Sequence, residues 1–140
     1  MPPKSPDRET IAHNFKDYPD YHDDEDIVRN AIDVDWKQLE FASPRIQDIE
    51  DIIENVVIRN GLALEFASPR IQDIENSVRY AVHQNGLSLK FASSRLQDNE
   101  DIVETALSQN GLVLQFASHR HQDSEDIVKT AVEQNGLALQ

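Results

Sequence analysis

The sequence has no cysteine, only four glycines and one tryptophan, and no long run of apolar residues. The lack of cysteine excludes a disulfide framework, cysteine-ligated zinc and thiol chemistry, and it is compatible with reducing and oxidising compartments alike. A transmembrane helix needs roughly 18 or more consecutive apolar residues. Because no such run is present, we expect a soluble protein without membrane insertion. The scattered glycines also exclude a glycine-rich phosphate loop.

Positive charge is scarce as well. Thirteen Lys and Arg residues stand against 26 Asp and Glu residues, which gives a net charge of -13. A polyanion would have to bind against the field of the whole molecule, so nucleic acid and anionic membranes are poor partners. A basic protein partner fits the charge better. Residues 1–6 show neither a secretory signal nor an amphipathic transit peptide, and the localisation stays unknown.

A tandem repeat of 25 residues organises the chain. Its Phe-Ala-Ser triplet at 41–43 recurs at 66–68, 91–93 and 116–118, which defines repeats 41–65, 66–90, 91–115 and 116–140. The same frame over 16–40 loses the Phe-Ala-Ser and Asn-Gly positions. We interpret 16–40 as a degenerate N-terminal capping repeat, because the end repeat of a solenoid has one face in water. Residues 1–15 are predicted to be a flexible tail with a helical turn at 7–14, ahead of one helical repeat domain over 16–140.

Each clear repeat contains the signals of one helix. In the third clear repeat, Asp98 and the acidic residues after it predict an N-cap and a first helical turn. The apolar residues from Ile102 to Leu107 have helical spacing. Asn110-Gly111 then predicts a helix end with glycine in the left-handed conformation. The corresponding residues of the other clear repeats predict the same helix.

The second half of each repeat is less decisive. In Leu62-Ala63-Leu64-Glu65-Phe66, apolar and polar positions alternate as in a half-buried strand, which would suit a β/α solenoid of the leucine-rich-repeat kind. Leu62 and Phe66 also have helical spacing, and we favour a second short helix that ends near Ser68, with Pro69 in the following turn. The prediction is an all-α fold, a short right-handed α-solenoid of five helix-pair repeats, and the β/α solenoid stays the alternative.

The pattern D-x-E-D-I-V-x-x-A-V-x-Q-N-G-L-x-L-x-F-A-S, read from Asp98 or Asp123 onward, resembles the tandem repeat of the family of domains of unknown function numbered 4116. The resemblance extends over 41–140, with the same spacing, and is poor over 16–40. It implies a helical array. It implies no activity, ligand or catalytic residue.

One arginine per clear repeat is identical without an evident role in folding. Stacked repeats would place these side chains in a row formed by Arg45, Arg70, Arg95 and Arg120. Such a ladder of guanidinium groups could bind carboxylates or phosphates on a partner. Alternatively, each arginine bonds helix carbonyls or the acidic residues of a neighbouring repeat. The acidic surroundings favour the local role.

The first predicted helix carries positions that vary between repeats. One column is Glu54, Arg79, Glu104 and Lys129, and a second column four residues later is Ile58, His83, Ser108 and Glu133. The two columns lie side by side on a helix face. They indicate either a recognition surface or the drift of solvent-facing residues, and both interpretations stay open. Leu137 and Leu139 are predicted to be exposed at an open C-terminal end, which either associates with another subunit or copy or belongs to a longer array of repeats.

Residues with catalytic or metal-binding chemistry do not form a recognisable set. His119 and His121 are two potential zinc ligands without a third, and the acidic run over 20–26 lacks the spaced oxygens and glycine of a calcium loop. No nucleophile has a partnered base at a recognisable spacing. We therefore predict no metal, no cofactor and no enzymatic activity. The predicted function is a non-catalytic scaffold or protein–protein interaction module, or a structural subunit of a larger assembly. The alternative is a binding domain for an anionic ligand or nucleic acid through the arginine ladder.

Overall fold

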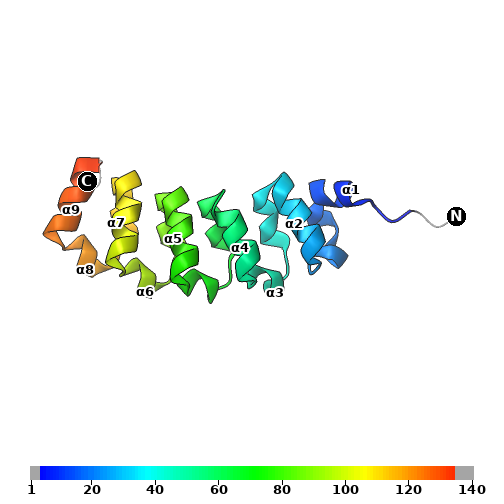
Figure 1. The fold of residues 1–140 in the computed structure, drawn as a ribbon, viewed down its shortest axis with the longest axis horizontal. Helices are drawn as coiled ribbons and strands as arrows, with labels where there is room; N and C mark the ends of the chain where they lie inside the picture. Colours follow the sequence, from blue (N-terminus) through cyan, green and yellow to red (C-terminus); the bar gives the residue numbers. More distant parts are fainter. Residues whose placement is uncertain (1–3, 135–140) are drawn as a thin grey trace.

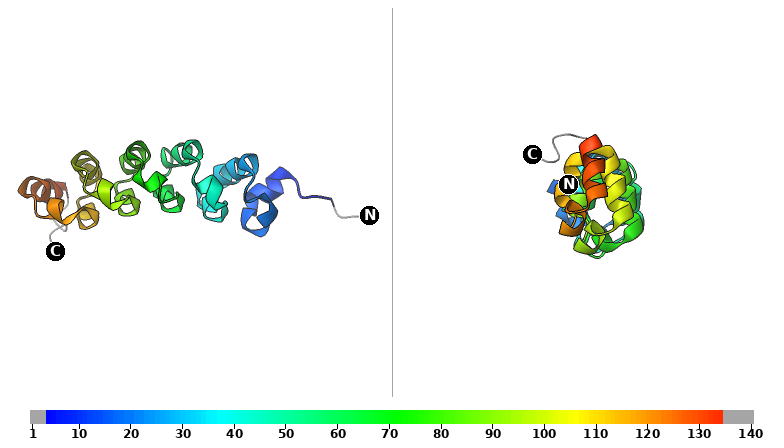
Figure 2. Two further views of the ribbon diagram at one scale, coloured as in Figure 1. Left: turned by 90° about the horizontal axis from the view of Figure 1, so that it is seen from below. Right: turned by 90° about the vertical axis from the view of Figure 1, so that its left-hand side faces the viewer.

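Helices follow one another along a single row in the computed structural model, which describes residues 4–134 (Figure 1). Within these residues every regular element is an α-helix or a 3₁₀-helix, and there is no strand. The predicted all-α repeat fold is confirmed, and the leucine-rich-repeat alternative is wrong. The right-handed twist of the solenoid stays a prediction. Figure 2 shows two layers, one of longer α-helices and one of shorter helical segments.

The longer α-helices begin the repeating unit. They are α2 (Glu25–Val34), α4 (Glu50–Val57), α5 (Glu75–Gln84), α7 (Glu100–Gln109) and α9 (Glu125–Gln134). Each buries an apolar stripe, as Ile102, Val103, Ala106 and Leu107 do in α7. Helices α4, α5, α7 and α9 pack each against the next, whereas the backbones of α2 and α4 approach one another less closely.

A 3₁₀-helix follows each of the first four long helices. These segments are η3 (Trp36–Phe41), η4 (Gly61–Phe66), η6 (Gly86–Phe91) and η7 (Gly111–Phe116). The predicted second short helix is therefore helical but tighter than an α-helix, and it ends before Ala67, which has extended backbone. In η4 the adjacent side chains of Ala63 and Leu64 are fully buried while Leu62 and Phe66 are partly exposed.

A short helical segment that the sequence did not predict leads into the next long helix. The four copies are α3 (Pro44–Gln47), η5 (Ile71–Asp73), α6 (Ser94–Gln97) and α8 (His119–Gln122). In α6 the cap is Ser93, whose hydroxyl accepts a hydrogen bond from the backbone N–H of Leu96. The prediction that Asp98 caps the long helix is wrong, because Asp98 ends α6 and Asn99 caps α7.

The glycines have a packing role and not the conformational one predicted. No glycine in the described part of the chain has a positive φ, so the left-handed helix end is wrong. Instead, a Cβ on Gly86 would lie 2.6 Å from the carbonyl oxygen of Ala106 in the next long helix, and a Cβ on Gly61 would clash with the carbonyl oxygen of Ala81. Glycine is required here because two backbones come close together.

The N-terminal end is capped by more than a degenerate repeat. Helix α1 (Arg8–His13) packs on α2, and it is followed by η1 (Phe15–Asp17) and η2 (Pro19–Tyr21). Ile11 and Phe15 are buried in the same core as the repeats. The turn predicted at 7–14 is present as α1, but the prediction of a flexible tail over 1–15 is wrong for residues 8–15, since these residues belong to the packed cap.

Candidate functional site

An aspartate of one repeat and a serine and an arginine of the next form a contact that we call the Asp–Ser–Arg clamp. In one copy, Asp73 Oδ1 accepts hydrogen bonds from Ser93 Oγ at 2.5 Å and from Arg95 Nε at 3.0 Å, and Arg95 Nη2 donates to the carbonyl of Asp73 at 2.6 Å. The other clamps are Asp23–Ser43–Arg45, Asp48–Ser68–Arg70 and Asp98–Ser118–Arg120. The clamp therefore joins each repeat to the next.

The clamps favour the charged form of their aspartates. The Ser93 hydroxyl, and after it the Arg95 guanidinium, holds the pKa of Asp73 below its ordinary value. The pKa of the other clamp aspartates is lowered in the same way, with the serine hydroxyl as the largest cause; they are Asp23, Asp48 and Asp98. The local bonds expected for the arginine row are present. A ligand role of Arg45, Arg70, Arg95 and Arg120 stays a prediction, and an anion would have to compete with these carboxylates.

The glutamines also connect backbone segments. Gln72 Nε2 donates to the carbonyl of Leu64 at 2.9 Å, and the N–H of Ser93 donates to the carbonyl of Gln72 in the preceding repeat at 2.8 Å. Gln84 Oε1 accepts a hydrogen bond from the N–H of Gly61 at 2.6 Å. Most residues that are identical between repeats thus hold the solenoid together, which leaves the remaining surface as the candidate for binding.

One edge of the solenoid is acidic. Every long helix carries one or two acidic residues in its first turn, and they are Glu25, Asp26, Glu50, Asp51, Glu75, Glu100, Asp101, Glu125 and Asp126. All of them are exposed. We call this row the acidic edge. Arg29 pairs with Asp51, Arg45 with Glu25 and Arg79 with Glu75. Within residues 4–134, most carboxylates of the acidic edge therefore have no cation partner.

The two variable columns lie on the long helices, and the exposure of their residues differs. Glu104, Lys129 and the whole second column, including His83, are exposed, whereas Glu54 and Arg79 are partly buried. Glu54 accepts a hydrogen bond from the buried hydroxyl of Ser77 at 3.2 Å. The structure therefore gives Glu54 and Arg79 contacts within the fold. A recognition role of the columns stays a prediction.

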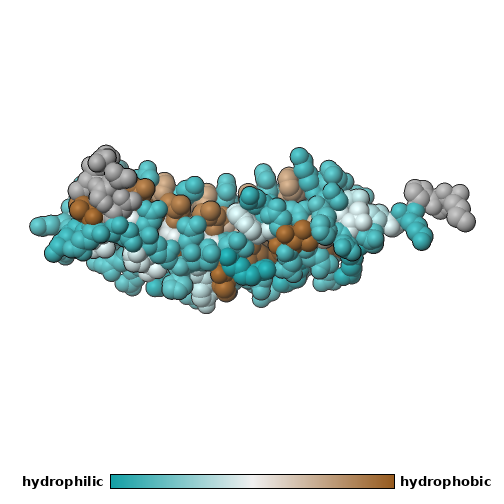
Figure 3. All heavy atoms as spheres, turned by 90° about the horizontal axis from the view of Figure 1, so that it is seen from above, coloured by the Kyte–Doolittle hydropathy of each residue, from teal (hydrophilic) through white to brown (hydrophobic). Residues whose placement is uncertain are grey.

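The opposite edge, where the long helices end in Asp-Trp or Asn-Gly, is the Asn-Gly edge. Figure 3 views this edge and shows separate apolar patches on a mostly hydrophilic surface. Val34 is 47% exposed and Ile58 is 55% exposed at the ends of α2 and α4. Leu62 and its equivalents Leu87 and Leu112 are partly exposed. Of these residues, only Ile58 was expected at the surface from the sequence, as part of the second variable column.

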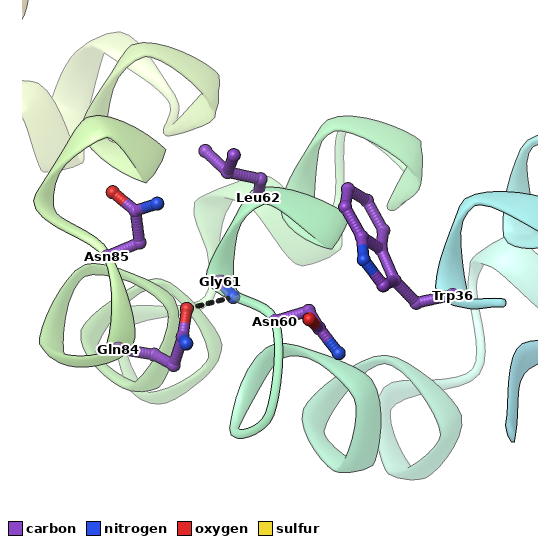
Figure 4. A pocket seen from close by; sticks show the side chains of 6 residues that line it. All are labelled: Trp36, Asn60, Gly61, Leu62, Gln84 and Asn85. Carbon is purple, nitrogen blue, oxygen red and sulfur yellow. Dashed lines mark hydrogen bonds between the residues drawn. The ribbon is translucent and has the colours of Figure 1, made fainter.

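A small cavity opens on the Asn-Gly edge. It has a volume of about 120 Å³ and is lined by Trp36, Asn60, Gly61, Leu62, Gln84 and Asn85. Figure 4 shows Trp36 on one side and Gln84 and Asn85 on the other, with Gly61 and Leu62 between them. The Trp36 ring lies 6.2 Å from the Phe66 ring and 6.0 Å from Lys37 Nζ. The sequence signal was the tryptophan at a position where the clear repeats have glycine.

The remaining predicted sites are less informative. His121 is buried, and its Nε2 lies 2.6 Å from the carbonyl oxygen of Asp98, whereas His119 is exposed. Residues 4–134 contain no group of three or more His, Asp or Glu residues placed to hold a metal ion. Leu137 and Leu139 lie outside the described residues. No helix in the part of the chain that the structure describes is long and apolar enough to cross a membrane.

The repeat and its geometry define a class of helical-repeat proteins. The family described as "Domain of unknown function (DUF4116)" matches the chain in four overlapping tandem segments, residues 24–72, 49–97, 75–119 and 99–140. The chain belongs to this family, as its repeat pattern predicted. No curated protein and no solved structure matches the chain.

Proposed function

We propose that the chain is a non-catalytic protein-interaction module that binds a basic segment of a protein partner along its acidic edge. The observation that supports this best is the alignment of acidic first turns at the same end of five long helices. The helix dipole favours carboxylates at these ends. A regular row of them also creates a negative field along the whole edge, which attracts a basic partner.

The clamps strengthen this proposal because they occupy the one basic residue that recurs in every clear repeat. Arg70 and Arg95 lie in the segments before α5 and α7, and each bonds the carboxylate and the carbonyl of a clamp aspartate. Their charge is therefore balanced locally, and Glu100 and Asp101 in the first turn of α7 remain for a partner, whereas Glu75 of α5 is paired with Arg79. The net charge of -13 agrees with this assignment.

The spacing of the repeats suggests the form of the partner segment. Packed neighbouring helices lie about 8–10 Å apart. A polyproline II segment has three residues per turn and advances about 9 Å in each turn. A segment with Lys or Arg at every third position would therefore present one cation to each successive long helix. This register distinguishes a specific partner from one that is merely basic.

The test compares two synthetic peptides of the same composition, one with lysine at every third position of a proline-rich chain and one with its lysines clustered. Fluorescence anisotropy at low salt should give tighter binding for the spaced peptide, with affinity falling as salt is added. In the acidic-edge variant Glu100→Gln/Asp101→Asn/Glu125→Gln/Asp126→Asn, we expect at least about fivefold weaker binding, since each exposed ion pair contributes a few tenths of a kcal/mol or more.

The matched control removes four negative charges elsewhere. Glu9, Asp17, Glu40 and Glu65 are exposed and lie outside both the acidic edge and the variable columns, and replacement of each carboxylate by its amide should change binding much less. Equal weakening in both variants, or equal affinity for both peptides, would show that only net charge matters and would refute the proposed register. Retention of the chain on a polyanion column at low salt would instead favour an anionic ligand on the arginine row.

A further inference from the structure

The cavity beside Trp36 exists because the repeat changes at one position. Trp36 occupies the place that Gly61 and Gly86 occupy in the next two repeats. Those glycines let the next long helix come close, whereas a tryptophan side chain at this position keeps it away. Helices α2 and α4 are accordingly farther apart than the later pairs of neighbouring long helices. The indole thus forms a side wall at this corner. One repeat further on, the corresponding wall residue is Gly61, which has no side chain.

The floor and far wall of the cavity offer hydrogen-bond donors whose orientation is set by the fold. Gln84 Oε1 accepts from the N–H of Gly61, so the amide nitrogen of Gln84 is left as the donor for a ligand. Asn85 Oδ1 accepts from the N–H of Leu87 at 3.0 Å, and its amide nitrogen is available in the same way. The Asn60 side chain makes no capping hydrogen bond. A ligand in this cavity would therefore find more hydrogen-bond donors than acceptors.

The size and polarity of the cavity limit what it can hold. An apolar cavity of about 150 Å³ accepts a benzene-sized group, so about 120 Å³ suits one aliphatic side chain but not a nucleotide. The lining has no charged residue and combines the apolar surfaces of Trp36 and Leu62 with three carboxamides. Small-molecule sites typically pair apolar walls with a few placed polar groups.

We infer that this cavity binds an uncharged peptide segment, with one aliphatic side chain against Trp36 and Leu62 and the neighbouring peptide carbonyls accepting hydrogen bonds from Gln84 and Asn85. The identity of the ligand as part of a protein partner rests on the proposed function. The cavity lies on the Asn-Gly edge, opposite the acidic edge, so the two contacts are made by different parts of the partner.

The test uses N-acetyl-leucinamide, an uncharged molecule with one aliphatic side chain and two carbonyls, as the probe. Trp36 is the only tryptophan of the chain, so its fluorescence and its single indole N–H signal in a nitrogen-15 NMR spectrum report directly on this cavity. We expect a saturable change in both signals at probe concentrations up to about 10 mM, which is sufficient for a millimolar Kd. N-acetyl-glycinamide, which lacks the side chain, should bind at least about fivefold more weakly.

The decisive variant is Asn85→Asp. It keeps the Oδ1 acceptor that caps Leu87 but replaces the amide donor by a carboxylate oxygen, so probe affinity should fall about tenfold. The matched control is Asn110→Asp, since Asn110 Oδ1 caps Leu112 in the same way one repeat further on, and it should leave probe binding unchanged. Gln84→Glu, which keeps the acceptor for Gly61, provides a second variant if Asn85→Asp unfolds.

Several outcomes would overturn the inference. No change at Trp36, equal weakening in the Asn110→Asp control, or stronger signals from methyl glucoside than from the leucine probe would each refute a peptide site. Failure of the charged peptides to bind the acidic edge would refute the proposed function alone, because the leucine probe carries no charge. The two failures are therefore distinguishable.

Discussion

Replacement of Gly86 by alanine tests how closely the repeats pack. A Cβ at this position would lie 2.6 Å from the carbonyl oxygen of Ala106 and 3.3 Å from the Ala106 Cα, where ordinary contacts begin at 3.4 Å. The obstructing atoms are backbone of α7, so they cannot move away as a flexible side chain does. Overpacking of this kind costs about 1–3 kcal/mol. We expect Gly86→Ala to lower the Tm by about 3–10 °C in a thermal melt.

Two further variants separate this cause from backbone conformation. A glycine in the left-handed conformation tolerates asparagine, whereas a glycine at a close backbone approach does not. Gly86→Asn should therefore destabilise the chain at least as much as Gly86→Ala. The approach is closer still at Gly61, so Gly61→Ala should be the more harmful alanine variant. An unchanged or raised Tm for Gly86→Ala would refute the reasoning, because alanine without a clash stabilises by lowering the entropy of the unfolded chain, by about 0.4–1 kcal/mol.

Three other predictions concern polar groups. Ser88 is fully buried and its hydroxyl has no hydrogen-bond partner within the described residues. Ser88→Ala should therefore raise the free energy of unfolding, measured by urea titration, by up to about 1 kcal/mol. A clear loss of stability would contradict the unpaired hydroxyl. The double variant Arg70→Gln/Arg95→Gln should melt at lower temperature because it opens two clamps, and an unchanged Tm would leave the arginines free for a ligand. The clamps lower the pKa of Asp23, Asp48, Asp73 and Asp98 in the folded chain. They therefore stabilise the fold at pH values above 3.8, the ordinary pKa of an aspartate. This stabilisation is lost as the pH falls through the lowered pKa values of the folded chain. The Tm, followed by circular dichroism, should drop below this pH, and less steeply in Ser93→Ala, whereas a Tm that does not respond to acid would contradict the clamp.

The repeat and its long helices were predictable because their signals are local. The stripe from Ile102 to Leu107 has helical period within a single segment, and it forms one face of α7 in the structure. The local bonds of the arginines were also predictable, since identical arginines in acidic surroundings have few other roles. The sequence could not distinguish a second α-helix from the 3₁₀-helix η4, because the spacing of Leu62 and Phe66 fits more than one periodicity.

The candidate sites were predictable only in part. The acidic first turns, such as Glu100 and Asp101, follow from the sequence once the long helix is placed. The cavity beside Trp36 does not follow, because its walls come from residues about 25 and 50 positions apart that only stacking brings together. The sequence marked the place by a tryptophan in a glycine position, but it could not show a cavity.

The sequence by itself therefore determined the 25-residue repeat, the all-α class and the position of each long helix, because apolar period and capping chemistry act within a few neighbouring residues. The tertiary structure alone decided what individual polar and small residues do. Asp98 resembles a helix cap in the sequence, yet it is bonded by Ser118 and Arg120 of the next repeat. Gly86 resembles a helix end, yet it is required by the carbonyl of Ala106. In both cases the deciding atom lies 20 or more residues away along the chain, beyond the reach of local pattern.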